Sequence, residues 1–177
     1  MSFADRLVLW LHIAFAIFTI GPLALAISST PRYIRRREVP VLRYLSRITL
    51  IFTAASLLVL VFGIVLGQID HAFSRPWLSV SMTLFVVAIV LLVLIVRDQR
   101  RAIRALAGAA ASAGTGAPPS GDLPSPGAEA GDATADQAAA AAHAAHVASI
   151  ERGRIAAFGG VVNLLWLVIL VLMVWRP

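Results

Sequence analysis

Cysteine and lysine are both absent from this chain of 177 residues. Without cysteine there are no disulfides, thiolate metal sites, iron–sulfur clusters or thiol nucleophiles. Without lysine, arginine supplies all 15 basic side chains. Charged residues make up only 14% of the chain, whereas 59% are hydrophobic and the mean hydropathy is +0.86. A composition so poor in charge excludes an ordinary soluble domain.

The hydrophobic residues are concentrated in four windows, and each is long enough to cross a bilayer, which takes about 20 apolar residues. The windows cover approximately residues 7–27, 45–66, 77–96 and 155–175. The sequence therefore predicts an all-α fold, a bundle of four transmembrane helices. Asp5 and Arg6 precede the first window, which is also too long for the apolar part of a signal peptide, so we expect that helix to be retained.

The distribution of arginine predicts the orientation in the membrane. Twelve of the 15 arginines flank or lie in the first and third loops, and three lie on the opposite side. Because basic residues accumulate on the cytoplasmic side, we expect both Arg-rich loops in the cytoplasm and both termini outside, in a multi-pass protein of the cell inner membrane. The first loop carries a basic cluster: Arg32, Arg35, Arg36 and Arg37. This cluster would contact anionic lipid headgroups or dock an acidic partner subunit, so the bilayer, and not nucleic acid, accounts for the basic charge.

The third loop is long and rich in Gly, Pro and Ala. Its central part, 108–137, is predicted to be a disordered cytoplasmic linker because it has too few large apolar residues to offset the entropy of ordering. It separates two parts of one membrane domain, 1–107 with three helices and 138–177 with the fourth. The Ala-rich flanks are predicted to extend the third and fourth helices into the cytoplasm. On the extension of the third helix, Arg97, Arg101 and Arg104 share a face that could meet lipid phosphates.

Small and weakly polar residues recur at steps of three and four along the second window. This small-residue stripe comprises Ser46, Thr49, Thr53, Ser56, Gly63 and Gly67. Small side chains let helix backbones approach closely in a bilayer, so the stripe predicts a helix-packing interface. Gly160 and Asn163 form a shorter version on the fourth helix. Thr19, Thr53 and Asn163 lie at similar depths and predict a hydrogen-bonded layer. We expect helices one, two and four to form the tighter core, and helix three to be more peripheral or to pack through large apolar residues.

His12 is the titratable residue inside the first window, in "LWLHIAFAIFTIGP" (residues 9–22). We favour a packing or hydrogen-bonding role for it beside the Gly63–Gly67 part of the second helix. An outward-facing metal site of His12, Asp70 and His71, or a pH-sensitive role, stays open. The other histidines lie in a loop or on the opposite side, which disfavours a bis-histidine haem, and no cofactor is predicted. The sequence has no evident nucleophile–base set, HExxH motif or phosphate-binding loop, so we do not expect an enzyme.

The stretch "LWLHIAFAIFTIGP" and the ending "RIAAFGGVVNLLWLVILVLMVWRP" resemble a family of small bacterial four-helix integral membrane proteins of unknown function. That family is distantly similar to copper-resistance D-like membrane domains, in which a histidine early in the first helix precedes a glycine motif. The exclusive use of arginine and the high alanine content are typical of a high-GC genome, such as an actinobacterial one. The resemblance covers the four helices but not the linker, and it implies a four-helix bundle.

Two functions are compatible with these patterns. The first is a non-enzymatic accessory or assembly subunit with other membrane protein subunits as partners, for example in a lipid-importing Mce-type transporter or a respiratory complex. The alternative is a small metal-handling or solute transporter, or a redox membrane protein, that uses His12. No acidic or basic residue lies deep inside the apolar windows, and this disfavours an ion pathway.

Overall fold

The computed structural model describes residues 3–69, 75–114 and 129–175, and within these ranges the chain forms four helices and no strand. The helices are α1 (Phe3–Arg36), α2 (Val39–Ile69), α3 (Pro76–Gly114) and α4 (Glu129–Trp175). Each contains an apolar stretch long enough to cross a membrane. The prediction of an all-α bundle of four membrane helices is therefore confirmed.

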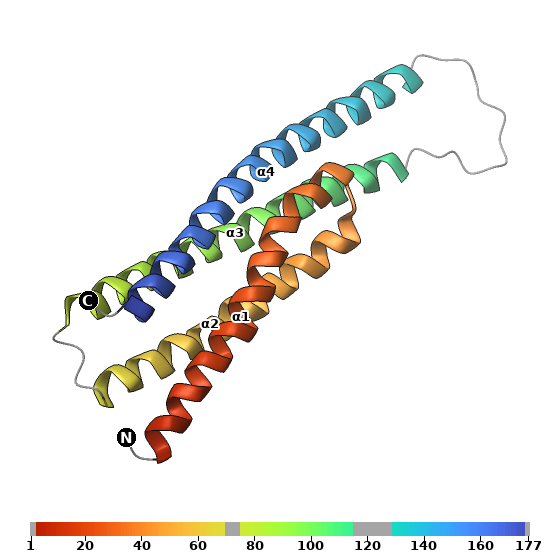
Figure 1. Ribbon diagram of the computed structural model, residues 1–177. Helices are drawn as coiled ribbons and strands as arrows, with labels where there is room; N and C mark the ends of the chain where they lie inside the picture. Colours follow the sequence, from red (N-terminus) through yellow and green to blue (C-terminus); the bar gives the residue numbers. More distant parts are fainter. Residues whose placement is uncertain (1–2, 70–74, 115–128, 176–177) are drawn as a thin grey trace.

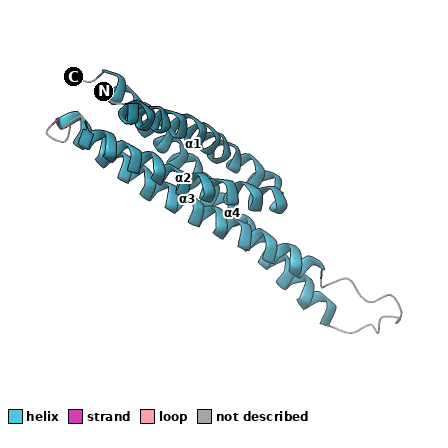
Figure 2. Cartoon of the chain, turned by 90° about the horizontal axis from the view of Figure 1, so that it is seen from below, coloured by secondary structure: helices cyan, strands magenta, loops and turns pink. Residues whose placement is uncertain are grey.

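The four helices form two antiparallel hairpins of unequal length (Figure 1). The α3–α4 pair continues well beyond the turn between α1 and α2, and the view from below shows the same projecting arm (Figure 2). We call the end of the bundle that carries the α1–α2 turn and this arm the Arg-rich end. The start of α1 and the end of α4 lie at the opposite end.

The most extensive helix–helix contact is between α3 and α4, followed by that between α1 and α2. Of the two expectations for helix three, a peripheral position is therefore wrong, whereas packing through large apolar residues is confirmed. The physical reason is a continuous buried stripe on α3, with steps of three and four residues, whose large apolar side chains pack into the core. The α3 stripe consists of Leu78, Ser81, Phe85, Ala88, Leu92, Ile95, Gln99, Ala102 and Leu106.

A matching stripe on α4 meets the α3 stripe. It comprises Ala144, Ala148, Glu151, Ile155, Val162, Trp166 and Ile169. Phe85 and Trp166 pack edge to face with ring centroids 5.0 Å apart, in the favoured geometry for aromatic pairs. On the other hairpin, Phe15 and Phe62 stack at 5.5 Å between α1 and α2.

The first basic cluster is mostly helical, because α1 runs to Arg36 and α2 begins at Val39. The reversal takes place at Arg37, whose φ of 56° is left-handed. The Arg37 amide donates to the Ile34 carbonyl at 3.1 Å and the Glu38 amide to the Tyr33 carbonyl at 3.3 Å. These two bonds form a Schellman motif, a C-terminal cap in which glycine is the usual residue at the left-handed position.

Both helices of the arm enter the predicted linker 108–137, since α3 runs to Gly114 and α4 begins at Glu129. Alanine has the highest helix propensity, and it occupies residues 109–111 at the end of α3 and 138–142 just after the linker in α4. The remaining residues of the linker, 115–128, lie outside the described ranges.

Replacing Arg37 by glycine is expected to stabilise the protein, because glycine adopts left-handed backbone angles without the cost of about 1 kcal/mol that an L side chain incurs. Thermal unfolding in mild detergent measures the gain. Arg37→Ala is the matched control, since it removes the same charge and keeps the strain. Equal melting temperatures for the glycine and alanine variants would contradict the assignment.

Replacement by alanine should change the stability of the protein differently at the two adjacent glycines of α4, Gly159 and Gly160. A Cβ on Gly159 would lie 2.6 Å from Cγ2 of Ile27, whose side chain is fully buried, whereas a Cβ on Gly160 would meet nothing within 4 Å. We expect Gly159→Ala to cost about 1–3 kcal/mol through overpacking and Gly160→Ala to be neutral or stabilising. Similar unfolding temperatures for the two variants would show that α4 is rotated from this position.

Candidate functional site

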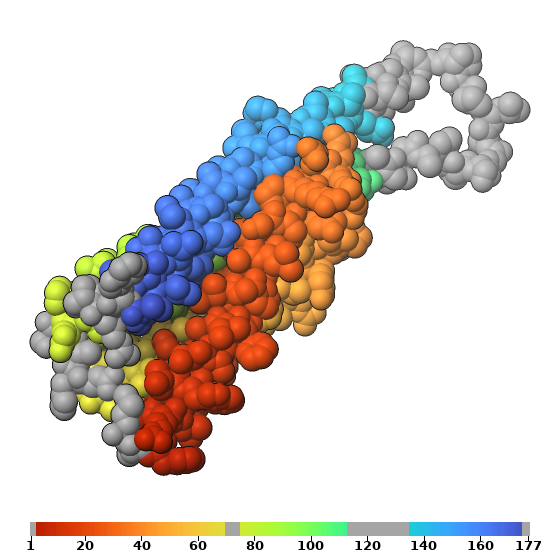
Figure 3. All heavy atoms as spheres, in the orientation of Figure 1, coloured from red at the N-terminus to blue at the C-terminus, as the bar shows by residue number. Residues whose placement is uncertain are grey.

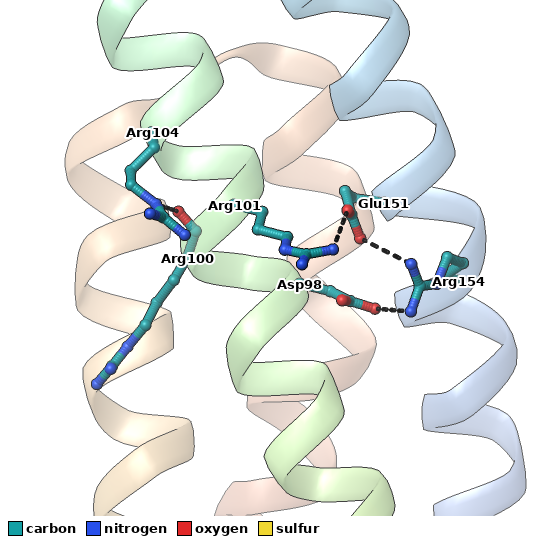
Figure 4. A network of polar contacts seen from close by, with 6 residues as sticks. All are labelled: Asp98, Arg100, Arg101, Arg104, Glu151 and Arg154. Atoms are coloured by element: carbon teal, nitrogen blue, oxygen red, sulfur yellow. Dashed lines mark hydrogen bonds and ion pairs between the residues drawn. The ribbon is translucent and has the colours of Figure 1, made fainter.

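Two carboxylates are buried between α3 and α4, where these helices leave the apolar part of the bundle (Figure 4). Asp98 on α3 has 0% of its surface exposed and Glu151 on α4 has 5%. Asp98 lies just after the apolar window of α3, and Glu151 lies one turn before that of α4. They are the buried acidic residues of the described structure, and both lie in or beside the stripes that pair the two helices.

Two arginines compensate these carboxylates. Arg154 Nη2 lies 3.3 Å from Asp98 Oδ2, and Arg154 Nη1 lies 3.9 Å from Glu151 Oε2. Arg101 Nη1 lies 3.9 Å from Glu151 Oε1. The arginine side chains are 40% and 42% exposed, so their charged groups remain partly hydrated while the carboxylates do not. We call these four residues the charge network.

The compensation is incomplete. Both oxygens of Asp98 and Oε2 of Glu151 lack a hydrogen-bond donor among the described residues. A buried carboxylate without such donors is costly to ionise. Burial, and then the negative charge of Asp98, raise the pKa of Glu151 above its ordinary value, and Arg154 and Arg101 offset only part of this effect. The arrangement can therefore hold or release a proton at Glu151, and it fastens α3 to α4.

A second polar contact joins three helices beside the charge network. Gln99 Nε2 on α3 donates to Thr30 Oγ1 of α1 at 2.9 Å and to Thr49 Oγ1 of α2 at 3.3 Å. The threonine hydroxyls in turn donate to carbonyls of their own helices, Ala26 and Leu45, both at 2.8 Å. All three side chains are buried, so this Gln99 layer ties the α1–α2 hairpin to α3.

The residues predicted to form a polar layer occupy other surroundings. Thr19 is buried, Thr53 donates to the carbonyl of Thr49 in its own helix at 2.6 Å, and Asn163 Nδ2 lies 3.5 Å from Ser28 Oγ. No hydrogen bond joins Thr19, Thr53 and Asn163 to one another in the part of the chain that the structure describes. A threonine hydroxyl in a helix can bond its own backbone, and this removes the need for a partner across the bundle.

Most of the small-residue stripe of α2 faces inward. Its buried members are Ser46, Thr49, Thr53, Ser56 and Gly67. Gly63 lies against His12, since a Cβ there would be 3.2 Å from the imidazole Cε1. The stripe is thus used inside this chain, against α1 and α3, and does not leave a surface for a second protein. The four arginines of the first basic cluster are all exposed near the α1–α2 turn: Arg32, Arg35, Arg36 and Arg37.

His12 is part of the α1–α2 contact. Its Nδ1 lies 3.1 Å from the carbonyl oxygen of Val59. Its predicted metal-site companions, Asp70 and His71, lie outside the described residues. Within the described ranges, no group of three or more His, Asp or Glu side chains is placed to hold a metal.

The sequence analysis missed the charge network because it treated the run "RDQRR" as part of a cytoplasmic helix extension whose arginines meet lipid phosphates, and assigned no role to Asp98. A signal was available in the spacing. The α3 stripe continues through the Arg-rich run in unbroken steps of three and four, from Ile95 to Gln99 and Ala102, and Asp98 lies on the inner edge of that stripe. On α4, Glu151 stands four residues before Ile155 and three after Ala148, again in phase with the apolar residues.

The raised pKa of Glu151 predicts the direction of a pH dependence. Because the folded protein binds this proton more tightly than the unfolded chain, whose ordinary value is 4.5, its stability should fall as pH rises above that value. Glu151→Gln cannot ionise, so the melting temperature of the wild type relative to this variant should decrease from pH 4.5 to pH 8. Asp98→Asn should weaken the same trend, and a difference that is constant with pH would contradict the assignment.

Comparison with known proteins places the chain in a family. Neither a curated protein nor a solved structure matches it. Residues 6–122, more than half of the chain, match the family described as "Predicted integral membrane protein (DUF2269)". The matched part includes α1 from residue 6 onward, α2 and α3, whereas Glu151 and Arg154 of the charge network come from α4, beyond it. The chain therefore belongs to this family of integral membrane proteins.

Proposed function

We propose that the protein is a non-enzymatic membrane subunit that binds a second helical membrane protein through the outer face of α4. In this proposal it lies in the bacterial inner membrane with its Arg-rich end in the cytoplasm, as the arginine asymmetry indicates. The observation that carries the proposal is a group of small and polar residues on α4 that the rest of the described chain leaves uncovered.

Gly153, Ala156 and Gly160 are all exposed on α4. A Cβ on Gly153 or Gly160 would meet nothing within 4 Å. Close packing of helices in a bilayer relies on such small residues, because they allow a neighbouring backbone to approach. Gly159, one position away, shows the same principle inside the chain, where it lies against Ile27 of α1. We call the exposed residues Gly153, Ala156 and Gly160, together with Asn163, the α4 outer face.

Asn163 adds a polar group to the α4 outer face. It lies nine residues beyond Arg154, which is roughly 13 Å along the helix and within the hydrocarbon region. It is only half-buried, and its contact with Ser28 at 3.5 Å is at the long limit for a hydrogen bond. A polar side chain at such a depth is disfavoured in contact with lipid and usually meets another helix.

The remaining membrane-facing surface has a different composition. Large aliphatic side chains cover it, for example Leu57 and Val61 of α2 and Leu164 and Leu170 of α4. Such side chains suit lipid chains and need no protein neighbour. The α4 outer face gathers several small residues and one amide along one side of α4, near its contact with α1, and the two helices run side by side along the face seen in Figure 3.

Photo-crosslinking in the native membrane tests this proposal. A photoreactive residue replaces Ala156 or Gly160 in turn, and the matched control places it at Val61, which is 51% exposed on α2. We expect a discrete protein adduct from the first two positions and lipid adducts alone from Val61. The adduct should be lost in an Asn163→Leu background, because that change removes the polar contact and adds bulk.

Folding of the variants is monitored in the same preparations. Because the space outside Gly160 is open, Gly160→Ile should leave the melting temperature of the isolated protein nearly unchanged while abolishing the adduct from Ala156. Lipid adducts alone at every position would reject the subunit hypothesis. Elemental analysis of the purified protein tests the alternative, since a stoichiometric metal that is lost in His12→Ala would favour the metal-handling function suggested by the resemblance to copper-resistance D-like domains.

A further inference from the structure

We propose that a groove between α2 and α3 at the Arg-rich end binds one anionic phospholipid. Its phosphate would lie against three arginines of α3, and the first part of an acyl chain would lie along the apolar floor below them. This site is on a different side of α3 from the charge network, and it does not depend on the protein partner proposed above.

The groove has a volume of about 360 Å³ and is open to the surface. It is lined by Leu50, Thr53, Val93, Val96, Arg97, Arg100 and Arg104. Leu50 and Val93 are exposed side chains, one from each helix, and form the apolar part that an acyl chain would cover. Val96 and Thr53 are buried and close the floor between the helices.

The rim of the groove is positively charged and uncompensated. Arg97, Arg100 and Arg104 recur at steps of three and four, so they share one face of α3, and all three are exposed. Arg104 Nε donates to the carbonyl of Arg100 at 3.4 Å, which orders the Arg104 side chain. Within the described ranges, none of the three arginines has a carboxylate within 4.0 Å.

The nearby acidic residues are engaged elsewhere. Figure 4 shows Arg100 and Arg104 on the side of α3 away from Glu151 and Arg154. The prediction placed Arg101 on the lipid-facing side, but its guanidinium turns toward Glu151 at 3.9 Å, and Arg100 takes the place beside Arg97 and Arg104. The charge network thus separates α3 into an acid-paired face and a face with three unpaired positive charges.

The position of the groove selects the chemistry of the ligand. Val93 and Val96 end the apolar window of α3, and the three arginines follow over about 10 Å of helix, so the groove crosses from hydrocarbon depth to headgroup depth. A phosphate with an attached chain fills both parts. A free phosphate or an acidic peptide would leave the apolar floor uncovered.

Native mass spectrometry of the full chain in mild detergent tests the site, with phosphatidylglycerol, phosphatidylcholine and inorganic phosphate as probes. We expect one tightly bound phosphatidylglycerol, with phosphatidylcholine and phosphate binding much more weakly. The triple variant R97Q/R100Q/R104Q should weaken phosphatidylglycerol binding about tenfold or more. The control variant R35Q/R37Q/R152Q removes the same number of charges from a separate pocket at the same end and should retain binding.

A substitution that leaves the charge unchanged tests binding of the acyl chain separately from binding of the phosphate. Val93→Trp fills the apolar floor at an exposed position and should weaken phosphatidylglycerol binding, whereas Val61→Trp, on exposed α2 surface away from the groove, should not. If the triple variant fails to fold, Arg100→Gln and Val93→Trp carry the test. Equal losses in both triple variants would indicate general surface charge and overturn the proposal. Phosphate binding that matches phosphatidylglycerol, or insensitivity to Val93→Trp, would also overturn it.

Discussion

Asp98 and Glu151 are buried in the contact between α3 and α4. The fold can keep these carboxylates away from water because the guanidinium groups of Arg154 and Arg101 lie next to them. Removing a carboxylate from water is costly, so the helices must stay in the register that keeps the guanidinium groups within reach. The apolar residues on either side, such as Ile95 and Ile155, are buried in the same core in that register. The charge network therefore sets the alignment of the longest helix pair, and the arm at the Arg-rich end projects from it.

The two hairpins are held together by different means. Between α1 and α2, small residues and His12 allow close approach of the backbones, and most hydroxyls bond carbonyls of their own helix. Between α3 and α4, large apolar side chains and paired charges form the contact. Gln99 connects the two halves by bonding Thr30 and Thr49, one from each helix of the first hairpin. A buried amide with two such partners specifies how the hairpins meet, because a rotation of α3 would leave it without either.

The outer surface can be understood in the same terms. Most of the membrane-facing side chains are large and aliphatic, as contact with lipid requires, and the departures from this pattern are local. One departure is the α4 outer face, with its glycines and Asn163. Another is the row of arginines above the α2–α3 groove. At both places the contacts within the described chain compensate a polar group poorly. This group is the Asn163 amide on the α4 outer face and the three positive charges at the groove.

Much of the fold follows from the sequence alone. The four apolar windows determine four membrane helices, because nothing shorter than about 20 residues spans the bilayer and nothing so apolar stays in water. Alanine propensity determined the helical arm, and the absence of cysteine excluded thiol chemistry. The pairing of the helices could not be derived in this way. Gly159 and Gly160 are the same residue type at adjacent positions, and only the rotation of α4 about its axis decides which of them faces Ile27. The same holds for "RDQRR", where tertiary packing turned Asp98, Gln99 and Arg101 inward and left Arg100 outside. Composition specifies what a helix can bury, but the phase of neighbouring helices, set by long-range packing, determines which of its side chains are buried.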